Sequence, residues 1–219
     1  MMAAMPATAT LSTKALAVYS ATLLALLAWS GWRPFDLATW LMEVVPALVV
    51  LVILWLTQRR FPLTPLLYAL IFLHACVLML GGHYTYARVP LGDWLREWFG
   101  LSRNPYDGIG HFMQGFVPAI AARELLLRHT GLSREDSRGG WLFVVVTAVC
   151  LAVSAIYELI EWGAAVALGQ GAEEFLGTQG DPWDTQKDML FAWIGAMVAQ
   201  WLLARWHDRQ LAALEGRSA

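Results

Sequence analysis

The sequence has few charged residues and only two cysteines. Asp, Glu, Lys and Arg make up 15% of its 219 residues, whereas an average soluble domain carries about 25%. Cys76 and Cys150 both lie inside apolar runs, which argues against a disulfide framework and against a thiolate zinc site. The formal net charge is −2 and there is no basic block, so we do not expect nucleic acid as a partner.

Long apolar runs are what the sequence has instead. Hydrophobic residues make up 58% of the chain, and the mean hydropathy is +0.51. A bilayer core of roughly 30 Å needs about 20 apolar residues in a helix. Six segments satisfy this: 14–32, 37–57, 63–82, 108–128, 141–168 and 186–206. We therefore predict an all-α polytopic membrane helix bundle of about six transmembrane helices, forming one integral-membrane domain over 1–219 with the lipid bilayer as its partner.

The first apolar run resembles a signal peptide, but no small-x-small cleavage site follows it before Arg33, so we interpret it as a retained span. The distribution of Lys and Arg then sets the orientation. With a cytoplasmic N-terminus, one side receives ten of these residues: Lys14, Arg59, Arg60, Arg123, Arg128, Arg134, Arg138, Arg205, Arg209 and Arg217. The other side receives five: Arg33, Arg88, Arg96, Arg103 and Lys187. We expect both termini in the cytoplasm and loops 83–107 and 169–185 outside.

This topology brings most of the unusual polar residues to one level of the outer leaflet. Asp107 and His111 open the fourth span at a spacing of four, and Glu158 and Glu161 lie three apart in the outer part of the fifth. Asp184 and Asp188, again four apart, lead into the sixth span. Residues at these spacings share a helix face. Carboxylates gathered in a membrane need a cation, a shared proton or an arginine partner.

We therefore predict an acidic pocket at the outer end of the bundle. The candidate catalytic residues are Asp107, His111, Glu158, Glu161 and Asp188, and the candidate metal ligands are the same five together with Asp184. Further candidates are Glu43, His74, His83, Tyr84, Tyr86 and Asp181. Ordinary structural roles stay open for several of these residues: helix capping by the two aspartates before the last span, interfacial anchoring by the tyrosines, and hydrogen bonding between helices by His74.

The pieces "GGHYTYA", "RNPYDGIGHFMQG", "SAIYELIEW" and "GDPWDTQKDM" resemble the YjdF-like family of uncharacterised bacterial inner-membrane proteins. This resemblance implies a multi-pass protein of the bacterial inner membrane, and it brings no activity with it. A more remote similarity is to VanZ-like membrane proteins. Asp107, His111 and Phe112 match the first element of their pattern, Glu158 the second, and Asp188 with Gly195 the third; Glu161 departs from it. That similarity implies a role at the cell envelope or in the glycopeptide response.

Three functions are compatible with these residues. The first is a membrane enzyme that uses a divalent metal ion as cofactor at the outer leaflet and acts on a lipid or lipid-linked head group, since a mixture of carboxylate and imidazole ligands suits such an ion. The second is a transporter with a proton or cation relay. The third is a non-catalytic membrane partner in the envelope stress response. Polar residues are scarce toward the cytoplasmic side, and there are no paired inverted repeats, which favours the one-sided pocket. Nothing in the sequence indicates an oligomeric state.

Overall fold

The computed structural model describes residues 10–134, 140–168 and 179–216, and within these ranges every regular element is helical. The elements are α1 (Thr13–Ser30), α2 (Leu37–Thr57), α3 (Pro65–Tyr84), the 3₁₀ helix η1 (Tyr86–Arg88), α4 (Pro90–Phe99), α5 (Tyr106–His129), α6 (Trp141–Leu168) and α8 (Asp184–Glu215). The prediction of an all-α helical membrane bundle is confirmed.

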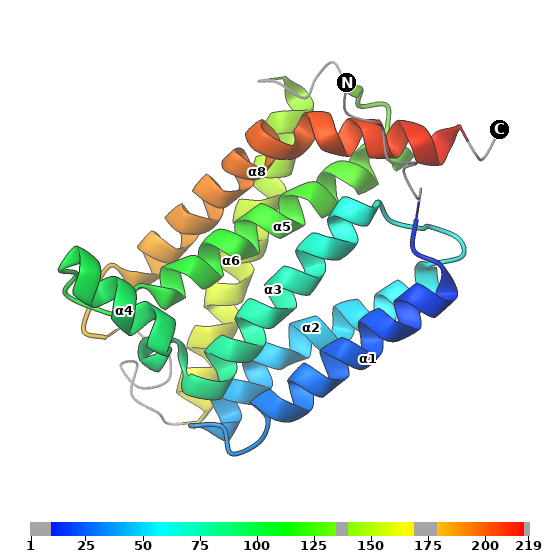
Figure 1. Ribbon diagram of the computed structural model, residues 1–219. Helices are drawn as coiled ribbons and strands as arrows, with labels where there is room; N and C mark the ends of the chain where they lie inside the picture. The colour runs from blue at the N-terminus through cyan, green and yellow to red at the C-terminus, as the bar shows by residue number, and fades with distance from the viewer. Residues whose placement is uncertain (1–9, 135–139, 169–178, 217–219) are drawn as a thin grey trace.

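The six long helices run up and down alternately along the bundle (Figure 1). We call the end where α1 begins and α8 finishes the inner end, and the end where α5 and α8 begin the outer end. The termini themselves, 1–9 and 217–219, lie outside the described residues, as do Arg138 and the first ten residues of loop 169–185. The assignment of the inner end to the cytoplasm stays a prediction from the Lys and Arg distribution.

The starts of the first three helices follow from local side chains. Ser12 accepts a hydrogen bond from the Ala15 N–H at 3.2 Å, and Asp36 accepts one from the Thr39 N–H at 2.7 Å. Thr64 caps α3, with Pro65 at the first helical position, where the missing N–H of proline has no cost. These caps satisfy backbone donors that a helix start leaves free.

Helix α5 is the interior helix of the bundle. Within the described part of the chain, five helices are long and apolar enough to cross a membrane: α1, α2, α3, α6 as Trp141–Ala167, and α8. α5 has 24 residues, a sufficient length, but it carries charged groups at both ends, and Asp107, Arg123 and Glu124 are all buried. Their polar atoms face neighbouring helices, which is how ionisable residues are accommodated in membranes. Neighbouring helices therefore shield more of α5 from lipid than its hydropathy indicated.

Helices α5 and α8 make the most extensive contact in the bundle, and glycine makes it possible. A Cβ on Gly115 would lie 1.8 Å from the Ala192 carbonyl oxygen, and one on Gly195 would lie 2.1 Å from the Phe112 carbonyl oxygen. Because both helices contribute a glycine, their backbones touch directly, the arrangement that small residues allow between membrane helices. This contact fixes Asp107 and His111 relative to Asp188.

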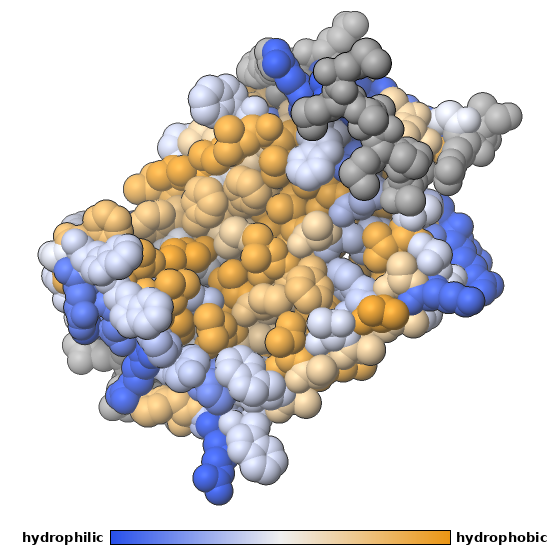
Figure 2. Space-filling model, viewed as in Figure 1, coloured by the Kyte–Doolittle hydropathy of each residue, from blue (hydrophilic) through white to orange (hydrophobic). Residues whose placement is uncertain are grey.

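The outside of the bundle is apolar along its length. Figure 2 shows one face, on which hydrophobic residues form a broad continuous area. Large exposed side chains on this kind of surface include Val52, Leu56, Ile156, Leu159 and Trp201. In water such a surface would drive aggregation, whereas in a bilayer it faces lipid.

Two regions of the chain differ from the sequence expectation. Loop 83–107 contains η1 and the ten-residue helix α4. The last helix continues to Glu215, well beyond the predicted end at 206. At 1.5 Å per residue its 32 residues span about 48 Å, so it extends past a hydrocarbon core of roughly 30 Å. The charged residues after 204 ended the hydropathy signal but not the helix.

Candidate functional site

Three carboxylates from three helices surround the His111 imidazole at the outer end. Its Nε2 lies 3.5 Å from Asp107 Oδ1 and 4.0 Å from Asp188 Oδ2. Its Nδ1 lies 3.7 Å from Glu158 Oε1. All four residues are at least nine-tenths buried. We call Asp107, His111, Glu158 and Asp188 the outer cluster; α5, α6 and α8 supply it.

Gln114 orients the imidazole within this cluster. Its side-chain oxygen lies 3.1 Å from His111 Nδ1, and an amide oxygen only accepts hydrogen bonds. The hydrogen of a neutral His111 is therefore on Nδ1, and the Nε2 lone pair is directed toward Asp107 and Asp188. Metal-binding histidines are commonly held this way, with the second ring nitrogen donating to an oxygen. Gln114 was not among the site residues predicted from the sequence, although its spacing of three from His111 places it on the same helix face.

Several buried polar atoms of the outer cluster lack a hydrogen-bond partner among the described residues. They are Asp107 Oδ2, Glu158 Oε1 and Asp188 Oδ1, and the neighbouring hydroxyls of Ser154 and Tyr157 share this property. Buried polar atoms are nearly always satisfied in folded proteins. One ligand atom each from Asp107, His111 and Asp188 lies within 4.8 Å of the other two, a spacing that a single cation can bridge.

A rim of ion pairs borders the cluster. The Arg103 guanidinium donates to Asp184 and lies 3.7 Å from Asp181, and Lys187 donates to Asp181. The hydrogen bonds from Lys187 and from the Trp183 N–H hold the pKa of the Asp181 carboxyl below its ordinary value. One carboxylate oxygen of Asp184 is therefore bonded to Arg103, and Asp181 belongs to the rim.

Glu43 and Tyr86 form a separate buried pair next to the cluster. The Tyr86 hydroxyl donates to Glu43 Oε2 at 2.8 Å. The Tyr86 ring occupies space left by Gly81 and Gly110, where an added Cβ would approach it within 2.5 and 2.6 Å. Burial is the main cause that raises the pKa of the Tyr86 hydroxyl well above its ordinary value, so it acts as a donor. Glu43 is within electrostatic range of Asp107 and His111.

The remaining candidates do not belong to the outer cluster. Glu161 is half-buried on α6 and interacts electrostatically with His111, and His74 on α3 has a buried Nε2 with no partner among the described residues. His83 instead bonds the Ser30 carbonyl oxygen through Nδ1 at 2.9 Å. Tyr84 packs edge-on against His83. His83 thus joins the end of α3 to α1, whereas Tyr84 packs with the apolar residues around Tyr86.

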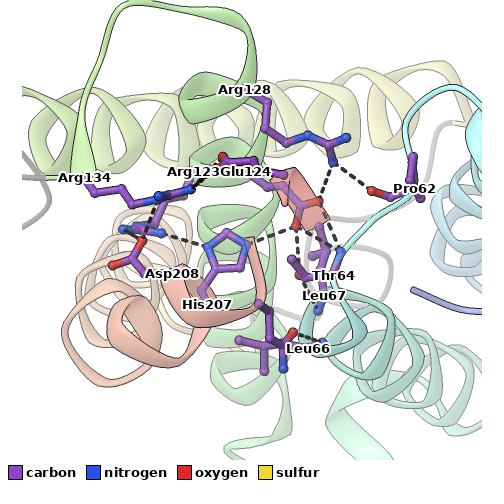
Figure 3. Close-up of polar contacts among 12 residues, drawn as sticks. Pro62, Thr64, Leu66, Leu67, Arg123, Glu124, Arg128, Arg134, His207 and Asp208 are labelled. Atoms are coloured by element: carbon purple, nitrogen blue, oxygen red, sulfur yellow. Dashed lines mark hydrogen bonds and ion pairs between the residues drawn. The ribbon is translucent and has the colours of Figure 1, made fainter. Parts of the chain in front are cut away.

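A second polar cluster, which the sequence analysis missed, lies at the inner end (Figure 3). Its centre is Glu124, whose oxygens accept from the Thr64 hydroxyl at 2.8 Å, from Arg128 at 2.9 Å and from His207 Nε2 at 3.0 Å. Arg123 bonds His207 Nδ1 at 2.9 Å and Asp208 at 2.7 Å. We call Thr64, Arg123, Glu124, Arg128, His207 and Asp208 the inner cluster.

The inner cluster is almost fully paired, and the outer one is not: within the inner cluster, Arg123 Nε is the one buried polar side-chain atom without a hydrogen-bond partner among the described residues. Arg123, Glu124 and His207 are 0% exposed, yet both Glu124 oxygens and both His207 nitrogens have partners. Because arginine only donates, His207 Nδ1 accepts from Arg123 and Nε2 donates to Glu124. This is the pattern of a structural lock that joins α3, α5 and α8. The outer cluster has acceptors and few donors, which is the pattern of a binding site.

Comparison with known proteins places the chain in a family. The family model described as "Predicted membrane protein (DUF2238)" matches residues 15–209. The inner membrane protein YjdF of Escherichia coli (strain K12) is 56% identical over 190 residues, which cover 87% of this chain and 89% of that protein. No solved structure matches the chain. The chain therefore belongs to the DUF2238 family of membrane proteins, and it is an integral, multi-pass protein of the inner membrane.

Proposed function

We propose that the outer cluster binds a divalent metal ion and is the catalytic centre of an enzyme that acts on a lipid or lipid-linked head group. The observation that carries the proposal is the approach of ligand atoms of Asp107, His111 and Asp188 to within 4.8 Å of one another. The unpartnered Asp107 and Asp188 oxygens belong to the same group. A cation would satisfy these atoms, which no described protein donor does.

Charge supports a cation over a purely structural cluster. Asp107, Glu158 and Asp188 place three carboxyl groups around one imidazole. Arg103, at the rim, is bonded to Asp184. Buried carboxylates without compensation are costly, and a divalent ion would offset most of this charge. The mixed oxygen and nitrogen ligands suit Zn²⁺ or Mn²⁺ better than Mg²⁺, which prefers oxygen alone.

Such an ion would lower the pKa of a bound water and polarise a phosphoryl or acyl oxygen. Glu158 would be the general base, because its Oε1 has no hydrogen-bond partner among the described residues and its carboxyl group is within electrostatic range of Asp107 and Asp188. The starts of α5 and α8 supply Asp107 and Asp188, within the first turns of both helices. A site at helix ends in a membrane lies near the level of lipid head groups, and this favours a lipid or lipid-linked substrate.

The middle of the bundle disfavours transport. Between the two clusters, α5 and α8 contribute buried apolar residues such as Val117, Ile120, Ala196 and Ala199. The polar Gln200 in this stretch bonds Thr147 on α6 at 2.9 Å. A transport path needs polar groups or water across the full thickness of the membrane, whereas α5 and α8 bury mainly apolar side chains between the two clusters.

Metal analysis of the purified protein tests the binding step. The full chain, in detergent and treated with a chelator, is dialysed against Zn²⁺ or Mn²⁺ and its metal content is measured. We expect about one ion per chain, and its loss in Asp188→Asn and in His111→Gln. Asp93→Asn is the matched control, because Asp93 is a partly exposed outer-end aspartate paired with Arg96. Equal metal content in all four proteins, or none in the wild type, contradicts the site.

Incubation of the loaded protein with phospholipid vesicles tests the chemical step. We expect release of a water-soluble head-group product that depends on the metal and is lost in Glu158→Gln, while Glu158→Gln retains at least part of the metal. Stoichiometric metal without product from any phospholipid or lipid-linked pyrophosphate would contradict the enzyme and leave a binding site.

A further inference from the structure

Helix α4 presents an apolar stripe to the outside of the molecule. Leu91, Trp94 and Trp98 are 46%, 67% and 86% exposed, and their spacings of three and four place them on one face. Phe99, at 70%, continues the stripe at the end of the helix. The polar residues Asp93, Arg96 and Glu97 share a different face. The helix is therefore amphipathic, with its apolar side exposed.

The other side of α4 is fixed to the bundle. Gly92 is buried, and a Cβ there would lie 1.8 Å from the Asn104 side-chain oxygen. The Asn104 amide donates to the Val89 carbonyl oxygen at 3.0 Å and to Asp93 at 3.2 Å. Asn104 itself is 1% exposed. This anchor holds α4 immediately before α5, next to Arg103 and the rim of the outer cluster.

We propose that α4 lies in the outer-leaflet interface of the bilayer, with its apolar stripe in lipid. Its ten residues span about 15 Å, too short to cross a core of roughly 30 Å. The apolar surface of the bundle continues toward the end where α4 lies (Figures 1 and 2), so the stripe borders a surface that already faces lipid. Tryptophan is also enriched at membrane–water interfaces.

The depth of α4 in the membrane also affects the outer cluster. Because Asn104 joins α4 to the start of α5, the depth of α4 sets the depth of Arg103 and Asp107. The rim would then sit at head-group level, where a lipid enters from the membrane plane. The membrane contact of α4 holds whether or not the cluster binds a metal.

Site-directed spin labelling in nanodiscs tests the proposal. The full chain with Cys76→Ser and Cys150→Ala carries one new cysteine, at Trp98 or Trp94 on the stripe, or at Glu97 as the matched control on the polar face. Accessibility to oxygen and to a water-soluble nickel chelate is measured for each label. We expect labels at 94 and 98 to favour oxygen, at a depth of about 5–10 Å below the phosphates, and the label at 97 to favour the nickel chelate.

Either of two results would overturn the proposal. If labels at 94, 97 and 98 all favour the nickel chelate, the stripe faces water. If labels at 94 and 98 are shielded from both reagents, a second copy of the chain covers the stripe. Because the labels at 94 and 98 are independent, failure of one variant to fold leaves the other as the test.

Discussion

Replacing Glu124 with glutamine should destabilise the protein more than any surface charge change. Glu124 is 0% exposed, and four donor groups reach it: the Thr64 N–H and hydroxyl, Arg128 and His207. An amide in its place turns an N–H₂ group toward donors and removes the charge that Arg128 pairs with. Hydrogen bonds between membrane helices average about 0.6 kcal/mol, so four give about 2.4 kcal/mol. Breaking a buried ion pair from one side costs about 3–5 kcal/mol.

We therefore expect a loss of about 3 kcal/mol for Glu124→Gln, just above the hydrogen-bond sum and at the lower end of the ion-pair cost. For a chain of this size that corresponds to a fall in melting temperature of roughly 6–12 °C. Cys150 is fully buried, so a thiol-reactive fluorescent dye in detergent reports unfolding without any added label. Glu215→Gln is the matched control, because Glu215 pairs with Arg134 at the same end but its side chain is 53% exposed; exposed pairs contribute about 0–1 kcal/mol.

A melting temperature for Glu124→Gln equal to that of Glu215→Gln would refute the reasoning. It would mean that the inner cluster does not join α3, α5 and α8. Asp188→Asn gives a further comparison in the same assay: if the outer cluster is a binding site with excess negative charge, removing one charge should leave the metal-free protein as stable as the wild type or more so.

Two further predictions follow from the packing and the topology. Gly115→Ala should lower the melting temperature and weaken metal binding, because the new Cβ would lie 1.8 Å from a backbone oxygen of α8; Gly163→Ala on α6, where a Cβ meets nothing within 4 Å, should change neither. In a cysteine-free background, a cysteine at exposed Leu101 should react with a membrane-impermeant maleimide applied to spheroplasts, whereas one at exposed Arg59 should react only after lysis; the reverse result would invert the topology.

Hydropathy was sufficient to predict most of the fold, because a span needs a long apolar window and little else. The predicted segment 37–57 coincides with α2, and 141–168 with α6. The convergence of Asp107, Glu158 and Asp188 on His111 also followed from topology, since alternate helix ends share one side of a membrane. Helix α4 was overlooked, although Pro90 at its start and the left-handed Gly100 at its end are both readable signals.

The inner cluster could not be predicted from the sequence, because it pairs residues that lie far apart in the chain. Glu124 and His207 are 83 residues apart, and Arg123 and Asp208 are 85 apart. No local spacing indicates that these residues face each other, because the rotation of α8 about its own axis decides it. That rotation is set by the contacts at Gly115 and Gly195, which are a property of two helices together.

Both clusters are built on the same pair of helices, α5 and α8, and they differ in how well their polar groups are paired. A membrane helix that buries charged groups needs partners for them, and at the inner end Arg123 and Glu124 on α5 find theirs in His207 and Asp208 on α8. At the outer end the same two helices bring Asp107 and Asp188 together. Two ionised aspartates cannot satisfy each other as an arginine and an aspartate do, so they need a shared proton or a cation. The same pair of helices therefore forms a paired polar lock at one end and, at the other, an acceptor-rich site that a divalent ion completes under the proposed function.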